Sequence, residues 1–399
     1  MPFYFPPISK FQFLLLFSII SFTLLLGRIP NENKFKFEKN STDRKTVLIA
    51  TTTYLQPSQR TGITCPIECD YHFEDEIQNL TVLASSDAVL FHLTTDDLLP
   101  VINLLHYRTK KWPSTNQYSF IQSQTWVIYG VESSDSMKMY TKIACNGALD
   151  GIFNWTMSFR HDSTIWLPNL NFIGFHPIQE EKLEKSYYHL QKMKVVNDSK
   201  IASKRRHIAA VISNCHDTYG RLAVLEQLKS FGLTVDVYGA CSPNNLKCPG
   251  RMSSECYEML EEKYYFYAAF ENSLCKDYFS EKLLNIFYYD MVPVVINGAD
   301  IDQPNENMPA FVDSKNFDTL KDFAEHLLEV TTYADRYQSY FEWRKNYGIL
   351  YESISHFCRV CMAIQDDQIG KQVPVGNFTN WILEKSECYQ QAFSTNSSL

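Results

Sequence analysis

The second half of this 399-residue chain alternates short apolar runs with longer polar or amphipathic stretches. Each apolar run has the length of one buried strand, and each intervening stretch is long enough for a helix. This β-α-β-α order predicts a doubly wound sheet of parallel strands. We expect strands at 207–214, 234–239, 264–272 and 292–297. We expect helices at 218–231, 253–263, 279–289 and 317–330.

The first half repeats the pattern less clearly, with apolar runs at 46–55, 88–93 and 126–132. A length of 399 residues favours two domains, and a hydrophobic content of 45% supplies enough apolar surface for two cores. The charged, loosely helical stretch 180–206 is the expected boundary between them. The fold class predicted is therefore α/β, with two Rossmann-like domains facing a cleft.

The N-terminus contains an uncharged apolar segment, residues 11–27, which is long enough to span a bilayer. A cleavable signal peptide is the alternative, but only Gly27 supplies a small residue near the expected cleavage site. We therefore predict an uncleaved anchor, preceded by a cytoplasmic tail at 1–10 and followed by a polar stem at 28–45.

Eleven cysteines and six N-x-[ST] sequons favour a lumenal or extracellular body. The alternative is a cytosolic protein with reduced thiols and unused sequons. The net charge of −8 argues against a general nucleic-acid binder, whose surface is basic. The sequons are Asn40, Asn79, Asn154, Asn197, Asn377 and Asn396.

Polar residues follow several of the predicted strands, where ligands bind in doubly wound sheets. Glu271 and Asn272 end one apolar run, and Glu281 and Lys282 begin the helix after it. A helix N-terminus with a lysine, joined by Arg221 from the first α/β unit, would suit a diphosphate. The alternative is an exposed helix start with an ordinary ion pair.

The stretch YYFYAAFENSLCKDYFSEKLLNIFYYDMVPVVI, residues 264–296, closely resembles the donor-site motif of the α1,3-fucosyltransferases, glycosyltransferase family 10. The segments 153–165, 213–221, 235–241 and 340–345 resemble further elements of that family, in the same order. The resemblance covers about 45–365. The cysteines after Ser-Asn and Tyr-Gly are similar to those of the plant and invertebrate branch, many of whose members modify the N-glycan core.

This resemblance implies a GT-B arrangement of two domains, with a GDP-L-fucose site on the second. Arg221 and Lys282 would hold the diphosphate and Glu281 the ribose. The segment WVIYGVESS resembles the one that carries the family's proposed general base, which points to Glu132. The donor-site positions are Ser213, Asn214, Arg221, Tyr267, Glu271, Asn272, Tyr278, Glu281 and Lys282.

The chain departs from the family pattern at three places. Ser134 replaces a proline, Asn169 stands where many relatives have tyrosine, and Asp290-Met291 replaces a pair containing glycine. The stretch ADID at 299–302 contains a D-x-D triplet, but the resemblance implies no required metal or cofactor, and Mn²⁺ stimulation stays open. We expect no metal ligands here.

The function predicted is inverting transfer of L-fucose from GDP-β-L-fucose to the 3-hydroxyl of an N-glycan GlcNAc. A core or distal chitobiose GlcNAc is favoured over an antennal one. Inversion requires one base to deprotonate the acceptor hydroxyl, and Glu132 fills that role. The alternative is a weak or inactive pseudoenzyme that binds GDP or glycans. The anchor predicts a single-pass type II protein of the Golgi membrane, acting on glycoproteins.

The cysteines allow several interpretations. Cys358 and Cys361 form a C-x-x-C, which can indicate redox chemistry or half a zinc site. Since no second C-x-x-C and no paired histidines accompany it, structural disulfides are favoured. Cys65 and Cys69 can pair with each other, or with Cys358 and Cys361 as in relatives. Cys215 and Cys241 end neighbouring predicted strands, so a bridge between them is sterically feasible. We expect a first domain at 46–200, a donor domain at 205–350, and a segment at 351–399 that returns to the first domain.

Overall fold

A computed structural model provides the structure of the protein. The residues it describes are 44–50, 64–73, 80–93, 98, 108, 119–136, 147–180, 183–215, 219–250, 253–296, 301–366, 375–383 and 385–388. The predicted anchor at 11–27 and the sequons at Asn40, Asn79 and Asn396 lie outside these residues. Within them, no helix is both long and apolar enough to cross a membrane.

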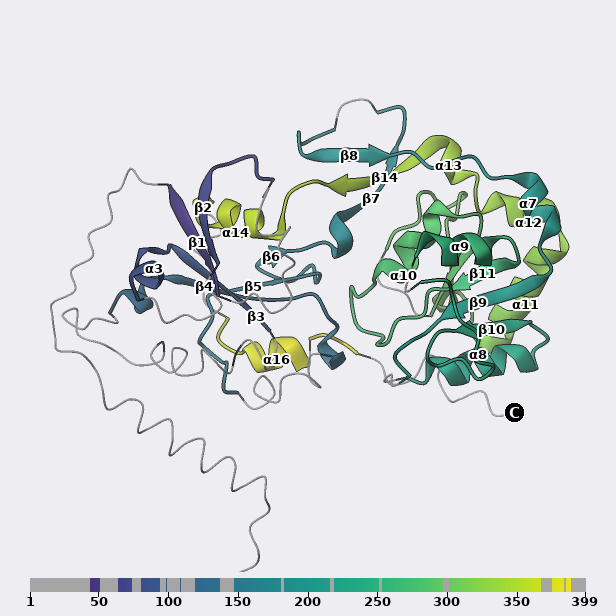
Figure 1. Cartoon of the computed structure of the whole chain (residues 1–399), viewed down its shortest axis with the longest axis horizontal. Helices are drawn as coiled ribbons and strands as arrows, with labels where there is room; N and C mark the ends of the chain where they lie inside the picture. The colour runs from purple at the N-terminus through teal and green to yellow at the C-terminus, as the bar shows by residue number, and fades with distance from the viewer. Residues whose placement is uncertain are drawn as a thin grey trace, which may run out of the picture.

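The first lobe is built on a parallel six-stranded sheet, confirming the strands predicted in the first half (Figure 1). Strand β1 is buried along most of its length because helices cover both faces of the sheet. Val47 and Ile49 pack with the helix α14, whereas Leu48 packs with the helix α16. In sheet order the strands are β2 (Cys69–Phe73), β1 (Lys45–Ile49), β3 (Ala88–His92), β4 (Thr125–Gly130), β5 (Trp155–Ser158) and β6 (Ile165–Trp166). The helices are α3 (Leu80–Ser85), α14 (His356–Gln365) and α16 (Phe378–Leu383).

The second lobe contains a parallel five-stranded sheet with helices around it (Figure 1), confirming the predicted alternation. In sheet order the strands are β10 (Val235–Tyr238), β9 (Arg206–Val211), β11 (Tyr264–Ala268), β12 (Val292–Val295) and β13 (Val312–Asp313). The helices are α8 (Arg221–Ser230), α9 (Ser254–Glu261), α10 (Glu281–Leu284), α11 (Leu320–Thr332), α12 (Ala334–Ser339) and α13 (Trp343–Asn346). It also contains the short 3₁₀ turns η4 (Asn285–Tyr288) and η5 (Ser314–Asn316), whereas η2 (Ser119–Gln122) and η3 (Asn169–Asn171) belong to the first lobe.

A small antiparallel sheet lies where the chain passes between the lobes (Figure 1). It joins β7 (Phe172–Pro177) and β8 (Tyr188–Gln191) to β14 (Tyr347–Glu352), which carries the chain back from the second lobe. The helical expectation for 180–206 was therefore wrong over β8. That segment becomes a strand because β14, distant in sequence, supplies its hydrogen-bonding partner. Only α7 (Asp198–Ser203) in this segment is helical.

Disulfide bonds join segments that are far apart in the sequence. Cys358 and Cys361, both fully buried on α14, bond separately to Cys65 and Cys69, which confirms structural disulfides over the redox and zinc alternatives. Because α14 packs on one face of the first sheet, over β1 and β3, its two cysteines meet the segment 64–73 at two separate points. The eleventh cysteine, Cys145, lies outside the described residues. The structure also contains Cys215–Cys241, as expected, and the unpredicted bonds Cys248–Cys256 and Cys275–Cys388.

Three of the sequons can be placed. Asn154 is tied into the first lobe, because its side-chain oxygen accepts from the Trp126 amide at 2.8 Å and from the Arg108 guanidinium at 2.6 Å. Asn197 is exposed and caps α7. Asn377 is also exposed, and its side chain accepts from the Asn380 amide at 2.7 Å.

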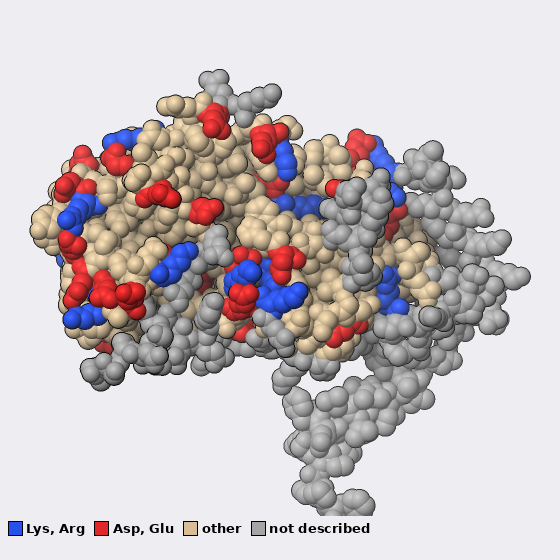
Figure 2. Space-filling view, turned by 180° about the vertical axis from the view of Figure 1, so that it is seen from behind, with Lys and Arg blue, Asp and Glu red and all other residues tan. Residues whose placement is uncertain are grey.

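Acidic and basic side chains are interspersed on the surface. Figure 2 shows most Lys and Arg side chains beside Asp or Glu on the rear face of the described residues. Exposed pairs include Lys345 with Glu342 and Lys229 with Glu226, each at 2.7 Å. Such pairing leaves the drawn face without an extended cationic surface.

Candidate active site

The loop after β11 places a buried carboxylate beside the start of α10. Glu271 is 7% exposed and accepts hydrogen bonds from the Ser280 hydroxyl at 2.8 Å and the Lys282 ammonium at 2.9 Å. Ser280 also caps α10 by accepting from the Lys282 amide. The segment from Glu271 to Lys282 therefore organises its own polar groups through local hydrogen bonds.

Lys282 is held between negative and positive neighbours. Burial lowers the pKa of its ammonium group, but Glu271 and Glu281 outweigh burial and raise it above the ordinary lysine value. The charge of Arg221 opposes this rise, which means that the two cations are close enough to interact. Together they form the positive part of the site.

Arg221 begins α8 and is almost fully buried, at 2% exposed. Its guanidinium donates to the Phe270 carbonyl at 3.1 Å and to the Asn214 carbonyl at 2.6 Å. Gly220 before it has a φ of 77°, a conformation that favours glycine. These contacts fix the guanidinium at the edge formed by β9 and β11.

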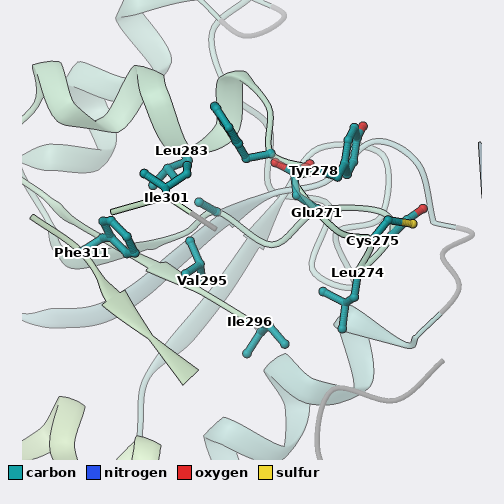
Figure 3. Close-up of a pocket in the computed structure, with 12 residues that line it drawn as sticks. Glu271, Leu274, Cys275, Tyr278, Leu283, Val295, Ile296, Ile301 and Phe311 are labelled. Carbon is teal, nitrogen blue, oxygen red and sulfur yellow. The ribbon is translucent and has the colours of Figure 1, made fainter. Parts of the chain in front are cut away.

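A small, mainly apolar pocket lies beneath the loop after β11. Figure 3 shows Glu271 and Tyr278 on one side of it and Leu283, Ile301 and Phe311 on the other. The carboxylate of Glu271 thus has a low-dielectric wall behind it, which strengthens its interaction with Lys282.

The structure brings Glu132 to this loop from the other lobe. The Tyr278 hydroxyl donates to Glu132 Oε2 at 3.4 Å, although the two residues are 146 positions apart. Burial, together with Glu271, Glu132 and Glu281, raises the pKa of Tyr278 well above its ordinary value. Tyr278 therefore stays protonated and can donate to a carboxylate at neutral pH.

Glu132 opens onto a cleft of about 660 Å³ between the lobes. First-lobe residues and the loop before α10 both contribute to its walls. The cleft is lined by Val131, Glu132, Leu167, Pro168, Asn169, Leu170, Tyr278, Phe279, Ser280, Glu281 and His356.

Polar contacts hold the two lobes together beside the cleft. Ser133 donates to Ser273 at 2.8 Å, and Asn272 Nδ2 donates to Ser136 at 3.0 Å. Asp277 accepts from the backbone amide of His161 at 3.0 Å. Asn272 was predicted to contact GDP-fucose, but its Nδ2 donates a hydrogen bond to the first lobe instead.

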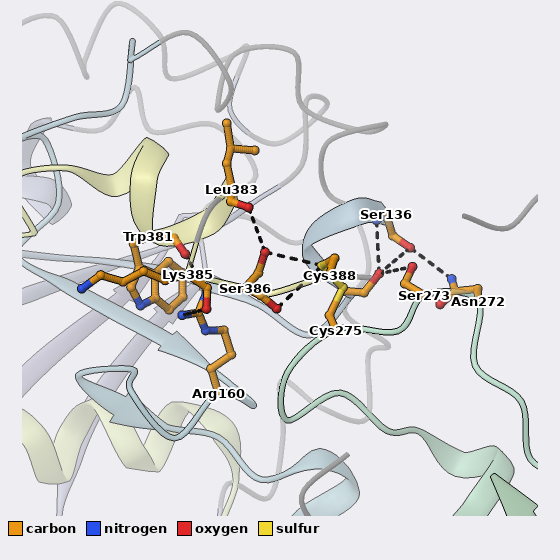
Figure 4. Close-up of a disulfide and its surroundings, with 11 residues drawn as sticks. Ser136, Arg160, Asn272, Ser273, Cys275, Trp381, Leu383, Lys385, Ser386 and Cys388 are labelled. Carbon is orange, nitrogen blue, oxygen red and sulfur yellow. Dashed lines mark hydrogen bonds between the residues drawn. A yellow bond between two sulfur atoms is a disulfide. The ribbon is translucent and has the colours of Figure 1, made fainter. Parts of the chain in front are cut away.

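A covalent strap reinforces this contact. The C-terminal segment after α16 returns to the loop after β11, where Cys388 bonds to Cys275 (Figure 4). Arg160 fastens the segment to the first lobe by donating to the carbonyls of Trp381 at 2.6 Å and Lys385 at 2.9 Å. The loop after β11 is therefore tied to both lobes.

The remaining predicted residues lie at different depths. Ser213 and Asn214 are exposed just after β9, next to the disulfide of Cys215. Tyr267 is 1% exposed, and its ring packs on Tyr257 with centroids 5.8 Å apart. We assign Tyr267 a supporting position beneath the site, because it lines none of the cavities described above.

Three residues of the site were not predicted from the sequence. Ser280 could have been, because a serine directly before a helix start is a preferred N-cap. Asp277 had no such signal, yet its backbone has a φ of 60° and its carboxylate contacts the other lobe. His356 faces the cleft only because α14 packs on the first sheet, and burial lowers its pKa.

No set of metal ligands is evident in the described part of the chain. The closest grouping is Asp135 with Cys275 and Cys388, whose sulfurs are joined in a disulfide and cannot bind as thiolates. Asp300 of the D-x-D triplet lies outside the described residues.

Comparison with known proteins adds a family context to this geometry. The model described as Fucosyltransferase, N-terminal, matches residues 42–170. The model described as Glycosyltransferase family 10 (fucosyltransferase) C-term matches residues 201–381. The two matches divide the chain at the crossing between the lobes.

Individual relatives include two fruit-fly proteins, both from Drosophila melanogaster. Alpha-(1,3)-fucosyltransferase C is 33% identical over 229 residues, covering 55% of this chain and 51% of the relative. Glycoprotein 3-alpha-L-fucosyltransferase A is 32% identical over 219 residues, covering 54% and 40%. The matched region thus spans about half the length of these relatives. A crystal structure of alpha1,3-fucosyltransferase with GDP aligns with a TM-score of 0.46 and 12% identity, over 87% of this chain and 96% of that one.

Proposed function

Because the chain belongs to glycosyltransferase family 10, we propose that it transfers L-fucose from GDP-β-L-fucose to the 3-hydroxyl of a GlcNAc residue. The single observation that carries this proposal is the approach of Tyr278 to Glu132 at 3.4 Å. It joins the proposed base to the loop that resembles a donor site, with an open cleft between the lobes.

The charges around α10 suit a nucleoside diphosphate donor. Lys282 and Arg221 would face the diphosphate, and the N-terminus of α10 adds a weaker positive field. Glu281, 36% exposed along its side chain, is available to accept hydrogen bonds from ribose hydroxyls. Glu271 keeps Lys282 in place by direct contact at 2.9 Å.

The reaction would proceed by one displacement with inversion. Glu132 removes the proton from the acceptor 3-hydroxyl as its oxygen attacks the anomeric carbon of fucose. The bond to the GDP phosphate breaks, and Lys282 and Arg221 stabilise the charge that develops on the departing GDP. Tyr278 donates to Glu132 and holds the carboxylate toward the cleft.

The acceptor and the location are further parts of the proposal. The relatives' names include a glycoprotein 3-alpha-L-fucosyltransferase, which supports a glycoprotein as acceptor. We propose that the acceptor sugar is an N-glycan GlcNAc, with a chitobiose GlcNAc favoured over an antennal one. The apolar segment 11–27, the sequons and the disulfides support a type II protein of the Golgi membrane with a lumenal body.

The test uses the full-length protein, purified in detergent, with GDP-fucose and a panel of N-glycans that offer a core, distal or antennal GlcNAc as acceptor. Mass spectrometry and linkage analysis would show one added fucose, α1,3-linked, on at least one glycan. GDP binding without transfer to any glycan would contradict the proposal and favour the pseudoenzyme alternative.

A further inference from the structure

A strained turn forms one wall of the cleft next to Glu132. In η3, Leu170 has φ 50° and ψ 28°, and Asn171 has φ 59°. Asparagine tolerates this left-handed conformation, but a leucine rarely adopts it because its Cβ crowds the backbone. Backbone strain of this kind concentrates at functional sites.

The strained turn also exposes an apolar side chain. Leu170 is 54% exposed, and Val131, directly before Glu132, is 39% exposed. Both line the cleft of about 660 Å³. Two apolar side chains are therefore exposed in the same cleft as the proposed base, although burying them within the lobe would lower the free energy of the folded state.

Asn169 adds an unpaired N–H to the same lining of the cleft. Its Nδ2 atom is buried and has no hydrogen-bond partner among the described residues. The side chain lies on the wall shared by the cleft and a smaller cavity of about 230 Å³, which Trp166 and Asp277 also line. An amide N–H without a partner costs free energy, and an acceptor carbonyl entering from the cleft would supply that partner after a small rotation of the Asn169 side chain.

We propose that Asn169, Leu170 and Val131 recognise the 2-acetamido group of the acceptor sugar; this rests on the proposed function. An acetamido group has a methyl, which suits Leu170 and Val131, and a carbonyl, which suits the Asn169 N–H. It is attached to carbon 2, next to the carbon that carries the reacting 3-hydroxyl. Holding it beside Glu132 therefore brings that hydroxyl to the base.

The experiment compares two acceptors that differ only in this group: a glycan of the panel that receives fucose, and the same glycan with glucose in place of the acceptor GlcNAc. The ratio of their kcat/KM values is measured for the full chain and for Asn169→Leu and Leu170→Gly. Each substitution is expected to lower the GlcNAc preference about tenfold, as the loss of one hydrogen bond or apolar contact does. The KM for GDP-fucose is expected to stay within about twofold.

Thermal unfolding separates recognition from structure. Leu170→Gly relieves the left-handed strain and Asn169→Leu removes the unsatisfied donor, so each variant is expected to unfold at the same or a higher Tm. Val195→Ala, at a residue 76% exposed and outside the cleft, is the matched control and should leave the preference unchanged.

Three results are decisive. An unchanged GlcNAc preference in both variants, with the parent chain active, would overturn the inference. A rise in the KM for GDP-fucose without loss of preference would also overturn it, because the apolar pair would then contact the donor fucose. If the parent chain transfers fucose to no glycan of the panel described above, the proposed function itself fails.

Discussion

The two sides of the cleft are constructed differently. On the second lobe, the site residues lie within one segment, from Glu271 to Lys282, and bond to one another through Ser280. On the first lobe, the wall combines Glu132, η3 and His356, which come from widely separated segments.

The two sides of the cleft are therefore expected to respond differently to substitution. The loop after β11 carries its own hydrogen bonds, so a substitution there should act mainly on the donor. The first-lobe wall depends on the packing of α14 and on the disulfides of Cys358 and Cys361. Changes there should act on the base and the acceptor. The following predictions test that division.

The largest expected effect is on the first-lobe side. Glu132→Gln keeps the shape of the side chain but removes the base, so kcat should fall about a thousandfold. GDP affinity, measured by calorimetry, should stay unchanged because the donor contacts lie on the other lobe. A kcat within tenfold of the parent would assign the base to another residue.

On the second-lobe side, Lys282→Met should raise the KM for GDP-fucose by tens of fold, because one charged contact to the diphosphate is lost. Steady-state kinetics at varied donor concentration would measure it. The acceptor KM should change little if the division holds. Lys345→Met, at an exposed lysine paired with Glu342 on the same lobe, is the control.

The strap between the lobes should have a smaller effect on catalysis than on stability. Cys388→Ser removes the bond to Cys275, which closes a loop with a sequence separation of 113 residues. The free energy of unfolding should fall by about 2–4 kcal/mol, which calorimetry would detect as a lower Tm. If both substrates' KM values rise together, the bond sets the geometry of the whole cleft, and the two sides are less independent than proposed.

The smallest effect concerns pH. The pKa of Lys282 is raised above its ordinary value, so its charge is complete below that value and is lost only as the pH rises through the raised pKa. The KM for GDP-fucose should therefore be constant between about pH 7 and 9, since free lysine titrates near 10.4. A threefold rise by pH 9 would show that Lys282 loses its proton earlier.

Much of the second lobe could be predicted from the sequence. Its strands alternate with helices in windows short enough for periodicity to reveal, and the segment 264–296 resembles a donor motif over its whole length. β8 was missed because its strand conformation depends on pairing with β14. The bond between Cys275 and Cys388 was missed because no local pattern connects them.

The sequence by itself determined the strand–helix order and the polar loop from Glu271 to Lys282, and through resemblance it led to the proposal of Glu132 as the base. These depend on local periodicity and on residues close in the chain. The tertiary structure decided that Tyr278 meets Glu132 and that Asn169 and Leu170 lie beside them. The reason is physical: such contacts depend on strand order, lobe packing and disulfides, which act between segments that no local pattern connects.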